Sequence, residues 1–315
     1  MKVAIVDPAL GTRNGGDAVI SRGIHHALKP ITGMADEVRR LALHRAPSRE
    51  ERDFLGASDE VLICGTNLMS NYMALRRRWP WSTDDLMQAA GRVTFFGVGW
   101  WQYQTGAIDP WSSRLLKRLQ GNHAWATRDD YSAKRLREAG LRATNLGCPT
   151  MWEMGSQVLP RAGSRVVATI TDYNQNPTLD RALLRLLQSS YRNISIWPQG
   201  QGDLEYIRRD LSTTVDVLDP SLTAFENALK MPGTNYVGLR LHGGIFAMQL
   251  GVPALVVAID NRTVEIAKSS GMYAPSRFDL PEIEAVLRGE EREVILRDLT
   301  SERELWLARW TRRER

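Results

Sequence analysis

A permanent cation and a titratable ring stand two residues apart at the end of one apolar segment. Residues 236–239 are typical of a buried strand, and Arg240 and His242 come directly after them. A guanidinium binds carboxylate or phosphate through two hydrogen bonds. An imidazole can give or take a proton near neutral pH. This spacing predicts a site for an anionic substrate that must gain or lose a proton.

A second acid and a second cation follow a later strand. Residues 254–259 are typical of a strand, and Asp260 and Arg262 come immediately after it. Asp260 could orient His242 or accept a substrate hydroxyl, and Arg262 could close over a phosphate. Capping of the next helix by Asp260 or Asn261 explains the same residues equally well.

Glycine-bearing polar loops also follow strands in the N-terminal half. Residues 11–17 open a helix, where backbone N–H groups can bind an anion and glycines allow close approach. Asp17 could instead cap that helix. Further loops hold Gly65, Gly97 and Gly99, and Arg128 follows one more strand, where it either points into a cleft or pairs with a neighbouring aspartate.

Ten tryptophans are unusual for 315 residues, and several lie in polar or turn-rich segments. Flat aromatic faces suit the apolar C–H surfaces of sugar rings. We therefore expect Trp100 and Trp101, with Trp79 and Trp81, to hold a sugar. Packing between domains is the alternative for some of them.

Strand-like and helix-like segments alternate along the chain, which is typical of parallel sheets covered by helices on both faces. Residues 151–164 are rich in proline and glycine and have little periodicity, which predicts a linker. We therefore predict an α/β protein with two doubly wound Rossmann-like domains, residues 1–150 and 165–290, that face each other across a cleft. A helix and basic tail would form residues 291–315. Ligands of such folds bind beyond the carboxyl ends of the strands.

Composition narrows the class of protein. Hydrophobic residues make up 43% of the chain and charged residues 24%, as in soluble globular proteins. Residues 1–8 predict a first strand rather than a signal peptide, and no apolar run approaches the ~20 residues of a membrane span. Two cysteines, Cys64 and Cys148, are too few for a disulfide framework or a zinc site, so we expect a cytoplasmic protein without a metal.

The net charge is +5, with clusters at residues 76–78 and 309–315. No basic helix is interleaved with stacking aromatic residues, which argues against binding to nucleic acid. A basic surface that attracts anionic substrates or membrane headgroups and a simple solvated face both fit this charge. The tail also suggests a peripheral contact at the inner face of the membrane.

Taken in order, these motifs resemble the polysaccharide pyruvyltransferase family. The likeness runs from residue 11 to residue 272, and the matching segments are residues 14–17, the Gly65 loop, 97–99, 128–132, 240–247, 251–253 and 259–262. One departure is the last segment. The family often has Tyr-Asp-x-Lys there, whereas this chain has an isoleucine before Asp260 and an arginine at 262.

The resemblance implies a glycosyltransferase-B-like fold, with phosphoenolpyruvate as co-substrate and no cofactor. It implies transfer to two hydroxyls of one sugar, in a polysaccharide or a lipid-linked oligosaccharide, to give a cyclic pyruvate ketal. The Arg-x-His motif of the family maps to Arg240 and His242, and its Arg-Asp motif maps to Arg128.

The resulting hypothesis assigns three sets of residues. His242, as imidazolium, would protonate the methylene carbon of phosphoenolpyruvate, with Arg240 and Asp260 beside it. Donor binding would involve Arg240, Arg262, Gly243 and Gly244 of the C-terminal domain, together with Arg128 of the N-terminal domain. Acceptor binding on the N-terminal domain would involve Asn14, Asp17, Asn67, Trp100 and Trp101.

Two other functions fit the same pattern. One is a glycosyltransferase that uses a nucleotide sugar, although the acidic pair that often holds ribose in retaining members of that fold is not evident after Gly243. The other is a non-catalytic glycan-binding protein, which the tryptophan-rich loops allow but the Arg240 and His242 pair makes less attractive.

Overall fold

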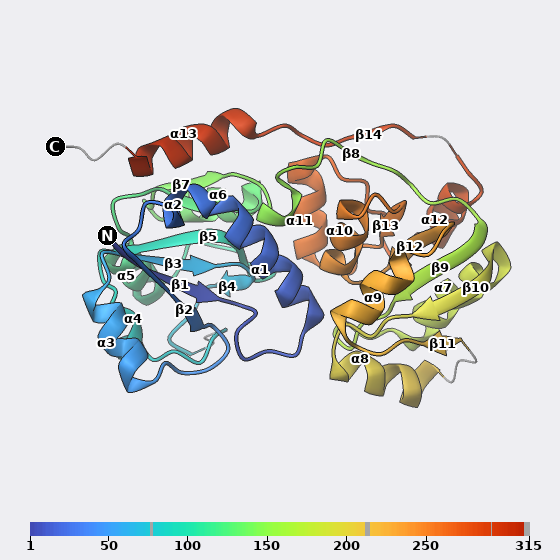
Figure 1. Cartoon of the computed structure of the whole chain (residues 1–315), viewed down its shortest axis with the longest axis horizontal. Coiled ribbons are helices and arrows are strands. Elements are labelled where there is room, and N and C mark those ends of the chain that lie inside the picture. Colours follow the sequence, from blue (N-terminus) through green and yellow to red (C-terminus); the bar gives the residue numbers. More distant parts are fainter. Residues whose placement is uncertain (76–77, 212–214, 291, 312–315) are drawn as a thin grey trace. The chain divides into compact units, whose positions relative to one another are not determined.

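The computed structural model describes residues 1–75, 78–211, 215–290 and 292–311. Its contacts divide the chain into two units (Figure 1). Unit 1 comprises Met1–Thr12, Ile20–Trp152 and Asp298–Arg315, and unit 2 comprises Arg13–Val19 and Glu153–Arg297. The C-terminal helix therefore returns to unit 1, while the first glycine-rich loop belongs to unit 2.

Unit 1 is built on a seven-stranded parallel sheet in the order β2-β1-β3-β5-β6-β7, with β4 paired to the end of β5. All eight residues of β5 are buried, as expected for a strand covered on both faces. The strands are β1 (Lys2–Asp7), β2 (Glu37–Ala42), β3 (Glu60–Cys64), β4 (Asn67–Met69), β5 (Val93–Trp100), β6 (Trp125–Thr127) and β7 (Ala143–Asn145).

Helices cover both faces of this sheet (Figure 1). Apolar side chains of one face pack with α1, α2 and α13, and those of the other face pack with α3, α4, α5 and α6. The helices are α1 (Gly15–Ala27), α2 (Lys29–Thr32), α3 (Arg49–Ala57), α4 (Thr83–Met87), α5 (Pro110–Leu119), α6 (Asp130–Glu138) and α13 (Thr300–Thr311).

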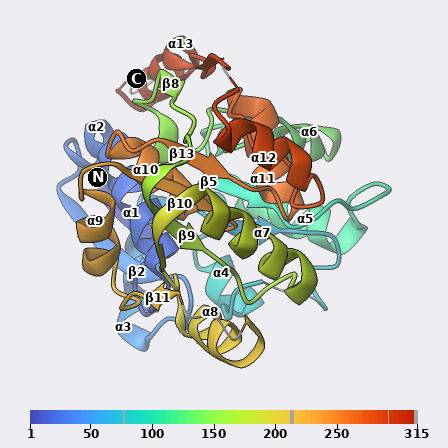
Figure 2. The same ribbon diagram turned by 90° about the vertical axis from the view of Figure 1, so that its right-hand side faces the viewer.

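Unit 2 has a five-stranded parallel sheet in the order β11-β10-β9-β12-β13. Strands β9, β10 and β11 of this sheet are labelled in Figure 2. The strand order reverses between β9 and β12, which are hydrogen-bonded neighbours. The strands are β9 (Gly163–Thr169), β10 (Tyr191–Ile196), β11 (Asp216–Val217), β12 (Thr234–Gly238) and β13 (Ala254–Val256), and β8 (Ser156–Gln157) pairs antiparallel with β14 (Val294–Ile295).

Helices α7, α8 and α12 pack their apolar side chains against one face of the second sheet. Phe225 of α9 and Phe246 of α10 belong to an aromatic group with Trp197 and Tyr236. The bounds are α7 (Pro177–Ser190), α8 (Gln201–Tyr206), α9 (Leu222–Leu229), α10 (Leu241–Gln249), α11 (Asn261–Ser270) and α12 (Leu280–Leu287).

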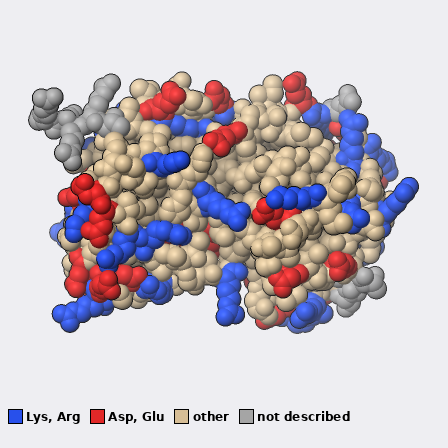
Figure 3. All heavy atoms as spheres, in the orientation of Figure 1, with Lys and Arg blue, Asp and Glu red and all other residues tan. Residues whose placement is uncertain are grey.

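The predicted α/β class and the two doubly wound, Rossmann-like domains are confirmed, because both sheets are parallel and their strands are linked by helices. No helix within the described ranges has the length and hydrophobicity that a membrane span needs. Acidic and basic side chains are interspersed on the face drawn in Figure 3. Of the two basic clusters, Arg76, Arg77 and residues 312–315 lie outside the described residues.

Candidate functional site

The best placed polar residues lie where the strand order of unit 2 reverses. Ligands of open α/β sheets bind beyond the carboxyl ends of the strands at such a point. After β9 the chain continues to Asp172 and Tyr173, and after β12 it continues to Arg240 and His242. Both predicted residues of the Arg-x-His motif are therefore at the expected edge of the sheet.

Arg240 is held by two carboxylates. Its Nε donates to Asp203 Oδ2 at 3.0 Å, and its Nη2 donates to Asp172 Oδ1 at 2.9 Å and also to Asp203 Oδ1. The carboxylate of Asp203 is wholly buried and also accepts the backbone N–H groups of Asp172 and Gln199, at 2.8 and 3.0 Å. The guanidinium is thus fixed in orientation, and its charge is matched inside the protein.

The surroundings of Arg240 keep it charged. Burial alone would lower the pKa of its guanidinium, because the charged form loses water. The nearby Asp203, Tyr173 and Asp172 outweigh burial, so the pKa of Arg240 lies above its usual value.

A second cation is tied to the first through one tyrosine. The ring centroid of Tyr173 lies 4.7 Å from the guanidinium carbon of Arg240 and 5.3 Å from that of Arg262. Arg262 Nη2 also donates to the hydroxyl of Tyr173 and, at 3.0 Å, to Asp260 Oδ2. Burial lowers the pKa of Arg262, but Tyr173, Asp260 and Asp17 together raise it above its usual value.

Asp260 is the N-cap of α11, and its Oδ1 accepts the N–H of Thr263 at 3.0 Å. The capping interpretation of Asp260 is therefore confirmed. With its other oxygen on Arg262, this carboxylate holds the second cation at the end of β13.

His242 is buried, with 5% of its surface exposed, and it lies in the first turn of α10. This helix begins at Leu241, with Arg240 as its N-cap. The imidazole is therefore carried by a helix that packs on the sheet rather than by a loop.

Gly244 has a packing role in the structure, and its predicted contact with the donor stays a prediction. A Cβ atom on Gly244 would lie 2.3 Å from Val256 Cγ2 and 2.9 Å from Tyr236 Cε1. The N–H of Gly244 donates to the carbonyl oxygen of Arg240 at 3.1 Å, within the helix. Gly243 is buried in the same way, and a Cβ atom on it would lie 3.1 Å from the hydroxyl oxygen of Tyr236. Both glycines let α10 approach the strands closely.

The predicted anion site at the start of α1 is wrong. The N–H of Gly15 donates to the carbonyl oxygen of Gln199 at 3.0 Å, and the N–H of Gly16 donates to Asn14 Oδ1 at 3.0 Å. Asn14 Oδ1 also accepts from Gln199 Nε2 at 2.8 Å. The glycine at position 16 does allow a close approach, since a Cβ there would lie 2.4 Å from the side-chain Nε2 of Gln199. Asn14 and Asp17 thus belong with the strand ends of unit 2.

Unit 1 has its own buried cation. Arg128 is 2% exposed, its Nη2 donates to Asn67 Oδ1, and its Nε lies 3.8 Å from Asp129 Oδ2. A Cβ on Gly99 would lie 2.6 Å from Arg128 Nε, so the glycine makes room for the guanidinium. The structure therefore brings Asn67, Gly99 and Arg128 together at one edge of the sheet. The joint grip of Arg128 and Arg240 on one donor stays a prediction.

The family model for polysaccharide pyruvyl transferase matches residues 14–261. The chain belongs to this family. The protein is therefore a transferase of the polysaccharide pyruvyl class, as the ordered motifs predicted. A comparison with curated protein sequences gave no significant match.

Solved structures show what fold the pyruvyl transferase shares. The UDP-GlcNAc 2-epimerase of Methanocaldococcus jannaschii, in complex with UDP-GlcNAc and UDP, is 10% identical, with 98% of this chain and 100% of that one covered and a TM-score of 0.56. The S. aureus MnaA–UDP structure is 12% identical, with 96% and 95% covered and a TM-score of 0.51. The E. coli heptosyltransferase WaaC, with ADP-2-deoxy-2-fluoro heptose, is 16% identical, with 82% of this chain and 88% of that one covered and a TM-score of 0.38. The first two confirm the predicted fold, a glycosyltransferase-B-like pair of Rossmann-like domains.

The tryptophan platform predicted for the acceptor sugar is largely wrong. Trp100 is 1% exposed and ends β5, and Trp79 and Trp81 are buried and stack on each other 6.0 Å apart in the core of unit 1. Trp101 is half-buried, and the guanidinium of Arg78 covers its ring at 3.1 Å. These large rings fill a core that the sequence context did not indicate.

Several polar partners in this pyruvyl transferase escaped sequence reasoning. Asp172 and Tyr173 follow β9. Because ligands bind beyond the carboxyl ends of parallel strands, their position in the sequence was enough to mark them as candidate site residues. In unit 1, Asp7 is the last residue of β1, and its carboxylate is buried. Its Oδ2 accepts a hydrogen bond from the hydroxyl of Ser21 at 2.9 Å and pairs with His25 Nε2 at 2.7 Å. His25 of α1 is thereby tied to the end of a strand.

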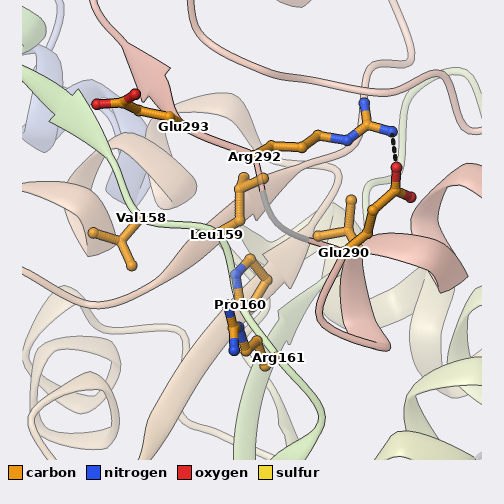
Figure 4. A pocket seen from close by; sticks show the side chains of 8 residues that line it. Val158, Leu159, Pro160, Arg161, Glu290, Arg292 and Glu293 are labelled. Atoms are coloured by element: carbon orange, nitrogen blue, oxygen red, sulfur yellow. Dashed lines mark hydrogen bonds and ion pairs between the residues drawn. The ribbon is translucent and has the colours of Figure 1, made fainter.

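A separate cavity of about 350 Å³ lies elsewhere in unit 2 (Figure 4). Val158 and Arg161 line it and precede β9, so the cavity is at the amino end of the sheet. Its Arg292 is paired with Glu282 at 2.7 Å and with Glu290 at 3.3 Å. Within the described residues, no group of three His, Cys, Asp or Glu side chains could hold a metal ion.

Proposed function

We propose that this pyruvyl transferase takes its pyruvyl group from phosphoenolpyruvate and forms a cyclic ketal on two hydroxyls of one sugar, in a polysaccharide or a lipid-linked precursor. One observation carries the proposal. The Arg-x-His motif of a family member lies at the point of strand reversal in unit 2, with Arg240 oriented by Asp203 and His242 on the first turn of α10.

The proposed reaction needs one proton donor and no redox step. His242 gives a proton to the methylene carbon of phosphoenolpyruvate, which becomes a methyl group and leaves positive charge at the neighbouring carbon. One sugar hydroxyl bonds to that carbon, the bond to the phosphate oxygen breaks, and the second hydroxyl closes the ring. The two hydroxyl protons replace the proton of His242 and protonate the phosphate.

The cations have distinct parts in this proposal. Asp203 is buried and fixes Arg240, whereas the side chain of Asp172 is 41% exposed. A carboxylate or phosphate of the donor can therefore replace Asp172 on Arg240 without breaking the buried pair. Arg262, which Tyr173 joins to Arg240, supplies the second positive charge.

The test is incubation with phosphoenolpyruvate and a panel of candidate glycans. Mass spectrometry should show a product heavier by pyruvic acid less one water, together with released inorganic phosphate. His242→Ala should lose most turnover and still bind phosphoenolpyruvate, while His26→Ala, an exposed histidine of unit 1, should keep full activity. Stabilisation by a nucleotide sugar and not by phosphoenolpyruvate in a thermal shift assay would refute the proposal.

The cellular setting follows from the same proposal. The donor is a small anion and the acceptor a glycan or its lipid-linked precursor, so we place the reaction in the cytoplasm, at the inner face of the membrane when the acceptor is lipid-linked. The basic residues near the C-terminus support a peripheral contact with anionic headgroups.

A further inference from the structure

The hydroxyl group of Tyr173 has hydrogen-bonding capacity that the protein itself does not use. Its oxygen accepts a hydrogen bond from Arg262 Nη2. A guanidinium only donates, so the hydrogen of the Tyr173 hydroxyl points away from Arg262. Within the described parts of the chain, no oxygen or nitrogen atom accepts that hydrogen. The side chain is half-buried and follows β9, one of the two strands between which the order of the sheet reverses.

The loop that carries Tyr173 is held by buried groups on both sides of it. The N–H of Asp172 donates to the buried carboxylate of Asp203 at 2.8 Å. The carbonyl oxygen of Asn174 accepts a hydrogen bond from Arg277 Nη1 at 2.5 Å. The side chain of Arg277 is 5% exposed and is paired with a buried carboxylate. Tyr173 therefore lies between two anchored residues.

The backbone just after Tyr173 is in an unusual conformation. Asn174 has a φ of 50°, in the left-handed region that residues other than glycine seldom adopt. Its Nδ2 donates to the carbonyl oxygen of Ile259, which follows β13, at 3.3 Å. Such a conformation persists only where the surrounding bonds impose it, and it is common at ligand-binding sites. The position of the Tyr173 ring is therefore set before a ligand binds.

Both guanidinium groups beside Tyr173 are already paired with carboxylates. Arg240 contacts two of them, and Arg262 contacts that of Asp260. Part of their charge is thus matched within unit 2, so an anion bound there gains from a further hydrogen-bond donor. A phosphate group has three acceptor oxygens, whereas a carboxylate has two. Two guanidinium groups and one hydroxyl as neighbours therefore suit a phosphate.

We propose that the hydroxyl of Tyr173 donates a hydrogen bond to a phosphate oxygen of the donor substrate and so selects a substrate that carries phosphate. The inference rests on the proposed function, in which the donor is phosphoenolpyruvate. Arg240 and Arg262 supply charge in this arrangement, and Tyr173 supplies a neutral donor whose hydrogen is not bonded within the described protein. No proton needs to leave Tyr173 during the reaction.

Tyr273 offers a matched control in the same unit. The guanidinium carbon of Arg292 lies 4.8 Å from its ring centroid, much as that of Arg240 lies 4.7 Å from the ring centroid of Tyr173. The hydroxyl of Tyr273, however, donates to Glu282. The two tyrosines share a cationic neighbour and differ in whether the hydroxyl hydrogen has an acceptor.

The test is isothermal titration calorimetry of Tyr173→Phe, which keeps the ring beside the guanidinium groups and removes the hydroxyl. The dissociation constants of phosphoenolpyruvate and of inorganic phosphate should rise about tenfold or more, as expected for the loss of one hydrogen bond to a charged group. The dissociation constant of pyruvate, which has a carboxylate and no phosphate, should not change. Tyr273→Phe should leave all three constants unchanged.

A double-variant cycle separates direct contact from an effect through Arg262, whose guanidinium loses one acceptor in Tyr173→Phe. In an Arg262→Gln background, Tyr173→Phe should still weaken the binding of phosphoenolpyruvate several-fold. If the hydroxyl acted only by positioning Arg262, the second change would have no further effect, and that result would overturn the inference.

The remaining outcomes separate this inference from the proposed function. An unchanged affinity of Tyr173→Phe for phosphate would overturn the inference, even if the unchanged protein transfers pyruvate to a glycan. Equal weakening of phosphate and pyruvate binding would also overturn it, because the hydroxyl would then not distinguish phosphate from carboxylate. If Tyr173→Phe binds phosphate more weakly but the unchanged protein forms no ketal on any glycan of the panel, Tyr173 recognises phosphate and only the proposed reaction fails.

Discussion

Removing the carboxylate of Asp203 should destabilise unit 2 more than removing any other partner of Arg240. Asp203→Ala leaves the guanidinium of Arg240, which is only 11% exposed, with a single carboxylate, that of Asp172. It also removes the acceptor for two backbone N–H groups, those of Asp172 and Gln199. The change therefore tests whether the network holds the site in place.

The size of the effect follows from burial. Breaking a buried ion pair by removing one partner destabilises a protein by about 3–5 kcal/mol. Asp172 stays on Arg240, but its side chain is 41% exposed, so it offsets at most about 1 kcal/mol. We expect a net loss of about 3 kcal/mol for Asp203→Ala. Asp172→Ala is the matched control and should lose less than about 1 kcal/mol.

Hydrogen exchange in increasing urea, read by mass spectrometry, can measure this loss separately for each unit. Peptides from β9, β10 and β12 report on unit 2, and peptides from β1, β3 and β5 provide an internal reference that should not change. A separate readout per unit is needed because a protein of two domains does not unfold in one step. Equal losses for Asp203→Ala and Asp172→Ala would refute the reasoning, because burial would then not distinguish the two carboxylates.

Three further predictions concern packing and pH. Gly244→Ala should destabilise the protein by about 1–3 kcal/mol, because the added methyl group overpacks against Val256. Calorimetry should show this loss as a lower thermal midpoint. Trp100→Ala should destabilise unit 1 by about 3–5 kcal/mol in urea titrations, as for a core ring. Burial and Asp59 raise the pKa of Glu60 to about 7 from 4.5, against the effect of Arg92. A carboxyl whose pKa is raised in the folded state stabilises the fold below its unfolded pKa, and this contribution is lost as the pH rises through about 7. The free energy of unfolding of Glu60→Gln should therefore exceed that of the unchanged protein by up to about 3 kcal/mol at about pH 8, and should equal it at about pH 4. A constant difference across that range would contradict this.

Local pattern was enough to predict most of the elements. The first strand expected in residues 1–8 is β1, and the strand expected at residues 236–239 is β12. The sequence did not reveal β2, because it is an edge strand whose first four residues, 37–40, are all at least partly exposed and include two arginines. With neither face buried over these residues, the alternation of apolar and polar side chains that marks a half-buried strand is missing.

The sequence by itself determined most of the order of strands and helices, the family, and the position of Arg240 and His242 after a buried strand. These follow from neighbours in the chain, since apolar periodicity and strand-end residues are local. Only the tertiary structure decided what Arg240 pairs with, because Asp203 and Asp172 are 37 and 68 residues away. It also decided that Trp100 is buried while Tyr103 is exposed, because burial depends on what packs against a side chain from distant segments, and no local pattern records that.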